Sequence, residues 1–231
     1  ETAPVYYAAP WTEANCDEYA RPLLTALGED FDAMEAERSE YRVDYTDPVN
    51  HSSLQVLFLG GFYALYQNQS GVTEPAPATA SREEVLQRLR SLGIPLPDRA
   101  DFSTEAEAYC FTVDGVEDGV LYQGQVTCTY REDGQILSLS DELVAVPQSG
   151  EVSICPPEKA VEQVCDGKFL DTDGRLSAGR SVEEGGVVRS DIDTLTIQSI
   201  TLAYLRDTKD YYQPVYAVKT DKGILYTLAT Q

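Results

Sequence analysis

The chemistry open to this chain is limited first by its histidine content, because His51 is the only histidine in 231 residues. A Ser-His-Asp or Cys-His device uses an imidazole as its general base, so any such device would depend on His51. That residue lies in the polar, turn-like stretch PVNHSS, where a surface or structural role is expected. The GxSxG, HExxH and GxxxxGK(S/T) motifs are also missing from the sequence. We therefore predict no catalytic residues and a protein that is not an enzyme.

The acidic residues do not define a catalytic or metal site either. There are 39 of them, so carboxylate pairs of the kind that glycosidases use are unavoidable and none can be singled out. Asp171 and Asp173 in the stretch DTDG resemble part of a calcium loop. In that register, however, the first and twelfth ligand positions would fall on Phe169 and Arg180, which do not bind calcium through their side chains. We expect an Asp-rich turn there, and no metal or other cofactor.

The five cysteines are spread along the chain without a CxxC pair. They are Cys16, Cys110, Cys128, Cys155 and Cys165. Zinc sites need clustered thiolates or imidazoles, so this spacing and the single histidine argue against one. If the protein is exported, one or two disulfides can form, and the odd count leaves at least one thiol free or paired between chains. The alternative is a set of reduced, mostly buried cysteines.

Charge is the most unusual property of the composition. The 17 Lys and Arg residues against 39 Asp and Glu residues give a formal net charge of −22. Residues 1–150 hold 26 acidic and 8 basic residues, a net of −18, whereas residues 151–231 hold 13 and 9, a net of −4. Such a surface repels phosphate backbones and anionic lipid headgroups, so nucleic-acid binding and direct membrane binding are not expected. The simplest role for this charge is solubility.

The fifteen tyrosines include the candidate binding residues. Five of them fall near the C-terminal end, at Tyr204, Tyr211, Tyr212, Tyr216 and Tyr226. A tyrosine combines an apolar body with a polar tip, which suits surfaces that recognise proteins or sugars. Alternation in a half-buried sheet places several of these rings in the core instead. Tyr211 and Tyr212 are the two that we expect to be exposed and to contact a ligand.

Helices are expected in three places. Apolar residues between Leu23 and Met34 recur at spacings of one, three and four, which predicts an amphipathic helix within the first forty or so residues. Ser81 and Glu84 have the spacing of a capping box, so a second helix is expected to begin there. A third helix is expected near Pro157, because proline is tolerated in the first turn of a helix.

Between and after these helices the sequence has the alternation and the turn residues of strands. Two apolar runs flank residues 60–61, both glycine, which favours a β-hairpin over a helix. From residue 106 to 146, strand-like runs and Asp-Gly pairs at 114–115 and 133–134 predict an antiparallel meander, and residues 194–230 predict a closing set of strands. The order of a helix followed by a meander thus occurs twice. We predict an α+β fold of tandem modules, each an amphipathic helix packed on an antiparallel β-meander.

The chain is long enough for two domains with cores of their own. Residues 1–150 are expected to form an N-terminal α+β domain with the acidic helix, the hairpin and one helix-plus-meander unit. Residues 151–231 are expected to form a second helix-plus-meander domain. No apolar run is long enough to cross a bilayer, so direct membrane insertion of the given chain is not expected. Because the chain starts at ETAPVYY without methionine, we expect a removed signal or lipoprotein leader, or a trimmed N terminus.

The C-terminal part of the chain resembles a known family. The runs CPPEKAVEQVCDGKF, IQSITLAYLRD and YYQPVYAVKTDKG are similar to the end of the YycH/YycI-type extracytoplasmic regulatory proteins of Gram-positive bacteria. Those proteins end in a capped helix, a strand of the type I-x-x-I-x-L-x-Y and a strand that opens with Pro-Val-Tyr or Pro-Thr-Trp. The matching positions here are Ile197, Ile200, Leu202 and Tyr204, then Pro214, Val215 and Tyr216. The run YQGQVTCTYREDGQILSL is similar to strands in these proteins and in the related PepSY-like modules, so the resemblance extends over about residues 81–231.

The resemblance implies a protein that faces outward and binds a partner or regulates a kinase, and it brings no catalytic residues with it. We therefore expect a non-catalytic extracytoplasmic protein, secreted or lipid-anchored at the cell surface, that acts by contact with an envelope protein such as a sensor-kinase ectodomain. Two alternatives stay open. One is a carbohydrate- or cell-wall-binding surface protein that uses exposed tyrosines, and the other is an inhibitor of an exported enzyme.

Overall fold

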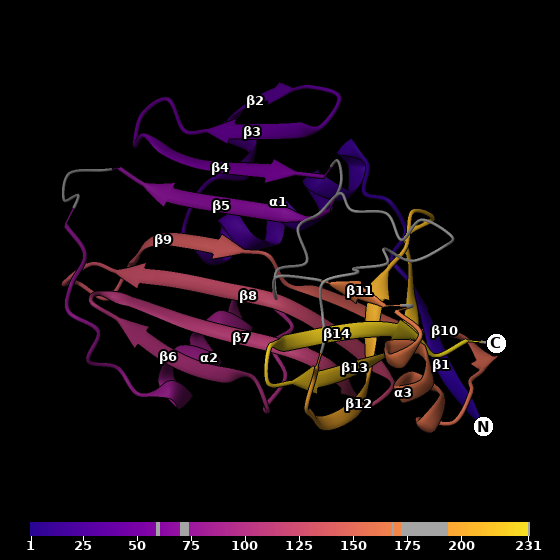
Figure 1. Ribbon diagram of the computed structural model, residues 1–231. Helices are drawn as coiled ribbons and strands as arrows, with labels where there is room; N and C mark the ends of the chain where they lie inside the picture. Colours follow the sequence, from indigo (N-terminus) through magenta and orange to yellow (C-terminus); the bar gives the residue numbers. More distant parts are fainter. Residues whose placement is uncertain (59–60, 70–73, 168, 172–193, 231) are drawn as a thin grey trace. The chain divides into compact units, whose positions relative to one another are not determined.

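The structure of the protein is a computed structural model, and it describes residues 1–58, 61–69, 74–167, 169–171 and 194–230. The chain forms two compact units, whose elements are labelled in Figure 1. The central unit consists of Pro10–Ala145, and the terminal unit joins Glu1–Ala9 to Val146–Gln231. The domain boundary predicted from the sequence lies after residue 150, with the first nine residues in the N-terminal domain. A single cut along the sequence cannot describe the terminal unit, because two distant segments share it.

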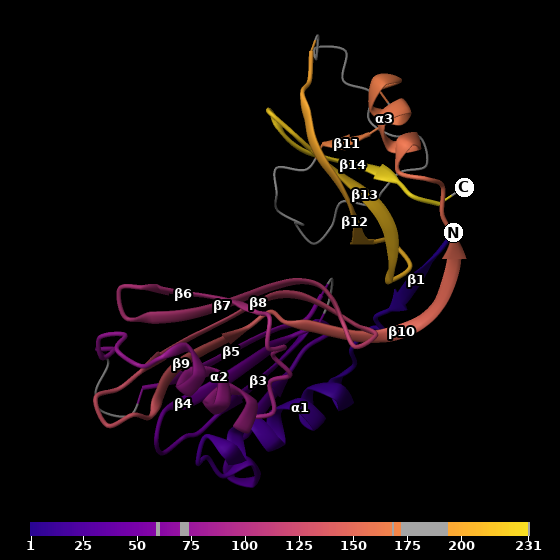
Figure 2. The ribbon, with the colours of Figure 1, turned by 90° about the horizontal axis from the view of Figure 1, so that it is seen from below.

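The central unit is built on one antiparallel sheet with the strand order β2-β3-β4-β5-β9-β8-β7-β6 (Figure 1). Its strands are β2 (Glu35–Arg38), β3 (Arg42–Thr46), β4 (Ser52–Leu57), β5 (Tyr63–Asn68), β6 (Asp101–Glu105), β7 (Ala108–Glu117), β8 (Val120–Tyr130) and β9 (Ile136–Asp141). The helices α1 (Glu13–Ala26) and α2 (Arg82–Ser91) lie on the same face of this sheet (Figure 2). A short 3-10 helix, η1 (Phe31–Ala33), follows α1.

The core of the central unit lies between the sheet and these two helices. Each helix turns one apolar stripe inward: Leu23 and Leu24 of α1 and Leu86 and Leu89 of α2 are buried. The strands contribute alternate residues to the same core, among them Val43, Tyr45, Leu54, Val56, Tyr66, Phe111, Val126 and Leu139. The period of the apolar residues in each segment therefore decides which side of it is buried.

Several local predictions are confirmed in the central unit. The amide of Ser81 donates to Glu84 Oε2 over 2.8 Å, and the amide of Glu84 donates to Ser81 Oγ over 3.4 Å, so the capping box at the start of α2 is present. The two apolar runs around residues 60–61 pair as the hairpin β4–β5, with Leu57 opposite Tyr63. The turn at 133–134 connects β8 to β9.

The first helix is shorter than predicted. It is confined to Glu13–Ala26, whereas residues 2–7 form a strand and residues 35–38 form β2. Gly28 follows the helix with a φ of +89°, the left-handed conformation in which glycine commonly ends helices. The apolar spacing continues beyond Gly28, but the backbone does not continue as a helix.

The predicted turn at 114–115 is wrong, because β7 runs through these residues and the chain turns at 118–119 instead. Gly115 lies opposite Tyr122 in the ladder with β8. Arg99 packs so closely against Gly115 that a Cβ there would lie 2.9 Å from Arg99 Nη1. Gly115 thus makes room for the side chain of Arg99. In the sequence, a glycine with this role looks the same as a glycine in a turn.

The terminal unit is a second antiparallel sheet with one helix. Its elements are β1 (Thr2–Tyr7), β10 (Val144–Ser153, of which the first two residues belong to the central unit), α3 (Glu158–Cys165), β11 (Leu170–Asp171), β12 (Ile197–Arg206), β13 (Tyr211–Thr220) and β14 (Gly223–Leu228). β12 pairs along one edge of β13, whereas β14 and β1 share the other edge. Ala160 and Val164 of α3 share a core cluster with Tyr216 and Val218 of β13. Within the described residues, none of the helices is long and apolar enough to cross a membrane.

The predicted fold class, tandem modules of an amphipathic helix packed on an antiparallel β-meander, is wrong. Strands hold 49% and helices 18% of the described residues, which makes the protein mostly antiparallel sheet. The physical reason is the pairing of β5 with β9, which joins the early hairpin to the later meander in one sheet that two helices share. Periodicity in a sequence identifies strands, but it does not say which strand edges meet.

Gly124 in β8 marks a close approach of two backbones. Its φ is +119°, and a Cβ built on it would lie 2.2 Å from the carbonyl oxygen of Glu142. We predict that Gly124→Ala lowers the free energy of unfolding of the central unit by at least ~2 kcal/mol, because both the backbone conformation and the clash oppose a side chain. Urea unfolding followed by the fluorescence of Trp11, the only tryptophan and a residue of this unit, measures the loss.

The matched control for this prediction is Gly134→Ala. Gly134 also has a positive φ, of +80°, but nothing lies within 4 Å of its Cβ position. This control is expected to lose about 1 kcal/mol through the conformation alone. Equal losses in the two variants would contradict the role that we assign to the contact with Glu142.

Asp141, at the end of β9, is a buried acid at the junction of β9 with β5 and β8. Its Oδ2 accepts a hydrogen bond from the hydroxyl of Tyr19 over 2.8 Å, and its Oδ1 accepts one from the amide of Leu143 over 2.9 Å. Burial raises the pKa of Asp141 to about 6, although both hydrogen bonds act in the opposite direction. The contact with Tyr19 links α1 to the sheet.

We predict that Asp141 adds to the stability of the protein as the pH falls. Unfolded aspartate has a pKa of about 3.9, below the value of about 6 in the folded protein. Protonation of Asp141 therefore stabilises the folded state as the pH falls through 6, and this contribution is complete below about pH 4. The contribution is lost as the pH rises through 6. Relative to Asp141→Asn, the wild type should gain on the order of 2 kcal/mol between about pH 7.5 and pH 4.5. Urea unfolding of both proteins, followed by Trp11 fluorescence, measures the difference, in which the titration of all other acids cancels. A difference that stays constant with pH would refute this assignment.

Candidate functional site

Tyr211 and Tyr212, the two predicted binding residues, follow each other at the start of β13 and therefore point to opposite faces of the sheet. Tyr211 is 37% exposed, whereas Tyr212 is 4% exposed and lies in the core. The expected exposure is thus correct for Tyr211 and wrong for Tyr212. A doublet of tyrosines does not reveal which ring faces inward, because that depends on the register of the strand.

A second exposed tyrosine, Tyr7 of β1, stands beside Tyr211. The two residues are directly opposite each other in the β1–β13 ladder, with ring centroids 4.8 Å apart and ring planes inclined at 36°. Tyr7 is 41% exposed. Tyr7 was not predicted as a binding residue, although Tyr6-Tyr7 is a doublet like Tyr211-Tyr212. One ring of each doublet is buried, and the pairing of the two strands brings the two outer rings together.

A groove of about 420 Å³ opens next to Tyr211, and all of it belongs to the terminal unit. It lies between the β1–β10 pair and the β12–β13 hairpin. Its lining residues are Val5, Ser149, Gly150, Glu151, Val152, Asp207, Lys209, Tyr211 and Gln213. These nine residues together with Tyr7 are called the tyrosine groove below.

The groove opens because β1 and β13 part after a short contact. β1 pairs with β13 only at Tyr6 and Tyr7, since β14 takes the same edge of β13 from Val215 onward. Pro214 stands between these two segments and has no amide hydrogen to donate. From there β1 continues in pairing with β10 alone, and the two walls of the groove separate.

One wall of the groove is held by hydrogen bonds to Asp207 in the turn between β12 and β13. Its Oδ1 accepts from the amide of Lys209 over 2.8 Å and from the amide of Tyr211 over 3.0 Å. Its Oδ2 accepts from Gln213 Nε2 over 3.4 Å. These bonds fix the backbone that carries Lys209 and Tyr211, so both side chains start from defined positions at the rim.

The opposite wall is formed by β1 and β10. The register of this pair slips at Ser149, whose hydroxyl donates to the carbonyl oxygen of Val5 over 2.9 Å. Glu151, two residues farther along β10, accepts a hydrogen bond from the hydroxyl of Thr2 over 3.1 Å. The bulge and these bonds turn polar side chains of β10 toward the groove.

The tyrosine groove combines aromatic rings with hydrogen-bonding groups of both charges. Lys209 supplies an ammonium group, Glu151 and Asp207 supply carboxylates, and Gln213 supplies a carboxamide. The nine lining residues include no imidazole and no thiol. A groove of this composition and of several hundred Å³ can hold a ligand that is polar with a flat or apolar part, such as a peptide segment or a sugar ring.

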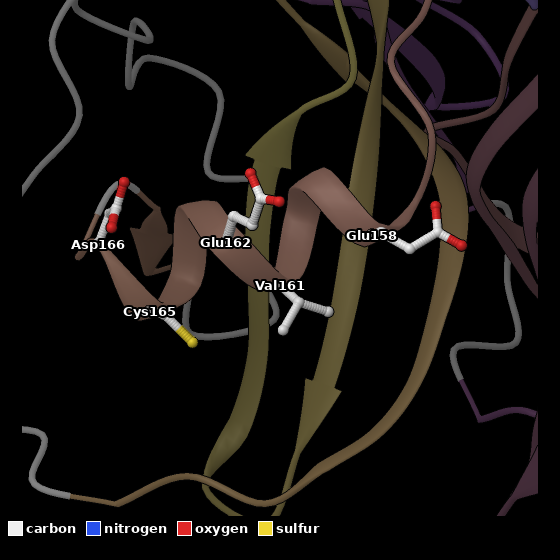
Figure 3. A pocket seen from close by; sticks show the side chains of 5 residues that line it. All are labelled: Glu158, Val161, Glu162, Cys165 and Asp166. Carbon is white, nitrogen blue, oxygen red and sulfur yellow. The ribbon is translucent and has the colours of Figure 1, made fainter.

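A second depression, of about 570 Å³, lies on the outer surface of α3. It is lined by Glu158, Val161, Glu162, Cys165 and Asp166. Figure 3 shows that its three carboxylates point in different directions instead of converging. Glu162 is already paired with Lys159 over 2.5 Å. Across the described part of the chain, no group of three or more His, Cys, Asp or Glu residues is placed to hold a metal ion, and we assign no ligand to this depression.

The remaining sequence candidates lie outside the tyrosine groove. His51 is exposed in the turn between β3 and β4 with a φ of +60°, and its amide donates to the carbonyl oxygen of Asp47 over 3.0 Å, which agrees with a structural role. All five cysteines are free thiols, of which Cys165 is exposed. Burial raises the pKa of Cys16 to about 11 and that of Cys128 to about 12. The DTDG stretch extends beyond the described residues.

Comparison with known proteins gives a likeness at the level of the fold alone. No protein-family model and no curated protein matches the chain. An uncharacterized protein from Eubacterium rectale ATCC 33656 is similar over 100% of this chain and 85% of its own, with 12% identity and a TM-score of 0.51. The Bacillus megaterium YpeB C-terminal domain is aligned over 97% of this chain and 95% of its own, with 11% identity and a TM-score of 0.37, too low to support an argument. The resemblance to YycH/YycI-type proteins stays a prediction.

The two tyrosines of β13 are expected to respond differently to truncation. Tyr212→Ala should cost about 3–5 kcal/mol of stability, because it empties a buried aromatic site. Tyr211→Ala should cost no more than about 1 kcal/mol, since it removes only the exposed ring contact with Tyr7. Amide hydrogen exchange of β13, read by mass spectrometry, measures both changes locally. A large loss of protection in Tyr211→Ala would show that this ring is a structural group.

Proposed function

We propose that the protein is a non-catalytic binding protein that works outside the cytoplasm and contacts a partner protein at the cell envelope through the tyrosine groove. The observation that carries this proposal is the pair of exposed rings, Tyr7 and Tyr211, set directly opposite each other beside a polar groove. An envelope protein such as a sensor-kinase ectodomain is the kind of partner that we expect.

Tyrosines held in paired strands suit protein recognition for two reasons. Tyrosine is enriched among the residues that dominate binding energy at interfaces. Its ring has few rotatable bonds, and Tyr7 and Tyr211 are also held by the ladder and by each other, so little conformational entropy is lost when a partner binds. Lys209 and Glu151 can then pair with charges of either sign on the partner.

The distribution of charge also favours the terminal unit as the contact surface. Glu1 and the 13 acidic residues of 151–231 stand against 9 basic residues, so the terminal unit has a net charge of −5. The central unit keeps the other 25 acidic and 8 basic residues, a net of −17. A partner surface with a negative net charge therefore meets less repulsion at the terminal unit than at the central one.

The test is site-specific photo-crosslinking on intact cells of the source organism. Tyr7 or Tyr211 is replaced by p-benzoylphenylalanine, and Tyr41, an exposed tyrosine of the central unit, carries the same replacement as the control. We expect both groove positions to capture the same envelope protein, which mass spectrometry identifies, and Tyr41 not to capture it. In the purified pair, Tyr211→Ala should weaken binding about 30-fold, the change expected when a 2 kcal/mol contact is lost. The same products from all three positions, or none from the groove, would refute the proposal.

A carbohydrate ligand is the second candidate, favoured by the combination of aromatic rings with Gln213, Lys209 and Glu151 in one groove. Sugars stack on aromatic rings and take hydrogen bonds from such side chains. A glycan array separates the candidates. If the function is carbohydrate binding, a glycan should bind the wild type and Tyr41→Ala but not Tyr211→Ala. The crosslinker should then capture cell-wall fragments instead of a protein. These two results together would replace the first candidate with this one.

A further inference from the structure

The outer edge of β12 differs from the edges of the central sheet. β2 and β6 end that sheet, and their exposed residues include Glu35, Glu37, Asp101 and Glu105. β12 pairs with β13 alone among the described strands, yet its ten residues carry no charge before Arg206. Proteins ordinarily protect a sheet edge with charges, prolines or very short strands, because its free N–H and C=O groups accept another strand. Among the described strands, the charges present at β2 and β6 are missing from the edge of β12, whose one irregularity is the register shift with β13 between Ile197 and Ser199.

An apolar side chain stands exposed at this edge. Leu202 is 40% exposed, and it lies opposite Tyr216 on the face of the sheet that α3 covers. Its neighbour on that face, Ile200, lies opposite Val218 and already packs against the core cluster there. The cluster therefore continues to the edge of the sheet and ends there with Leu202 uncovered. A strand added to β12 would extend the hydrogen-bonded ladder and bury this side chain.

We infer that β12 pairs antiparallel with β12 of a second copy of this chain, so that the two terminal sheets join in a symmetric dimer. The strand matches itself when the twofold axis passes through Thr201. Leu202 then meets Ile200 of the second copy on one face, and Ser199 meets Ala203 of the second copy on the other. The regular part of this match, residues 199–203, carries no charge, and Arg206, the charged residue of β12, lies beyond it. Two chains of net charge −22 can approach along this edge without direct contact between acids.

The first test is the oligomeric state of the full chain, measured by sedimentation equilibrium over a range of concentrations. We expect a monomer–dimer equilibrium in the wild type and a dissociation constant at least tenfold higher in Leu202→Lys, which places an ammonium group against apolar side chains of the second copy. Leu228→Lys is the matched control, since Leu228 is also an exposed leucine of this unit but belongs to β14. Its dissociation constant should equal that of the wild type, and circular dichroism checks that both variants fold. A wild type that stays monomeric at millimolar concentration overturns the proposal.

The second test locates the axis by disulfide formation. Residues directly opposite each other in an antiparallel pair have Cα atoms about 4.5–5.5 Å apart, within the range that a disulfide spans. Thr201→Cys should therefore give a covalent dimer under mild oxidation, beyond the background that the wild type shows through its own thiols. Ser199→Cys is the control, because its counterpart in the second copy would lie about 13 Å away along the strand. Equal crosslinking of both variants, or a dimer that Leu202→Lys does not weaken, would show that the copies meet elsewhere and would overturn the proposal.

The proposed dimer contact along β12 does not involve the tyrosine groove. Tyr211→Ala should leave the dissociation constant of the dimer unchanged, and Leu202→Lys should leave crosslinking from Tyr211 to a partner intact. A failure of one proposal can therefore be told apart from a failure of the other. Capture of a different protein along β12, with no dimer in solution, would replace the second copy by an extended segment of a partner.

Discussion

The pairing of β5 with β9 is the interaction on which the rest of the central unit depends. Ala64 to Gln67 pair with Asp141 to Ser138, so two segments far apart in the sequence form neighbouring strands. Closing so long a loop costs entropy that local contacts do not repay, and the apolar core beneath the sheet has to offset it. Once the two parts join, the sheet presents one broad apolar face, and both α1 and α2 are needed to cover it (Figure 2).

Hydrogen bonds from tyrosine hydroxyls to carboxylates then hold parts of this layered arrangement together. The pairs are Tyr19 with Asp141 (2.8 Å), Tyr45 with Asp17 (2.5 Å) and Tyr66 with Glu29 (2.7 Å). In each pair the ring packs with the core of the central unit, and the hydroxyl reaches an acid. Burial, together with the neighbouring acid, raises the pKa of all three tyrosines, which therefore stay protonated and donate. Some of the many acidic residues thus stabilise the fold in addition to increasing solubility.

In the terminal unit, the two edges of β13 explain the two surfaces that we assign to binding. One edge is divided between β1 and β14, and the division leaves the tyrosine groove where β1 departs. The other edge pairs with β12, which among the described strands has no second neighbour and carries no charge before Arg206. Both surfaces follow from how strands are shared around one central strand. They also lie in the unit with the smaller net charge, where contact with another protein is electrostatically least opposed.

Features that depend on neighbouring residues could be predicted from the sequence. The capping residues Ser81 and Glu84, the strands on either side of residues 60–61 and the alternation of the last strands all act within a few residues, so their patterns are readable. The candidate site was predicted in part, because Tyr211 was identified from the sequence, whereas Tyr7 and the groove were not. Three features became known from the three-dimensional structure: Tyr211 faces outward and Tyr212 inward, residues 1–9 join the terminal unit, and β5 pairs with β9. These features depend on strand register and on which strand edges pair. Strand edges pair through backbone hydrogen bonds, which all residue types except proline can both donate and accept, so no sequence pattern specifies the pairing.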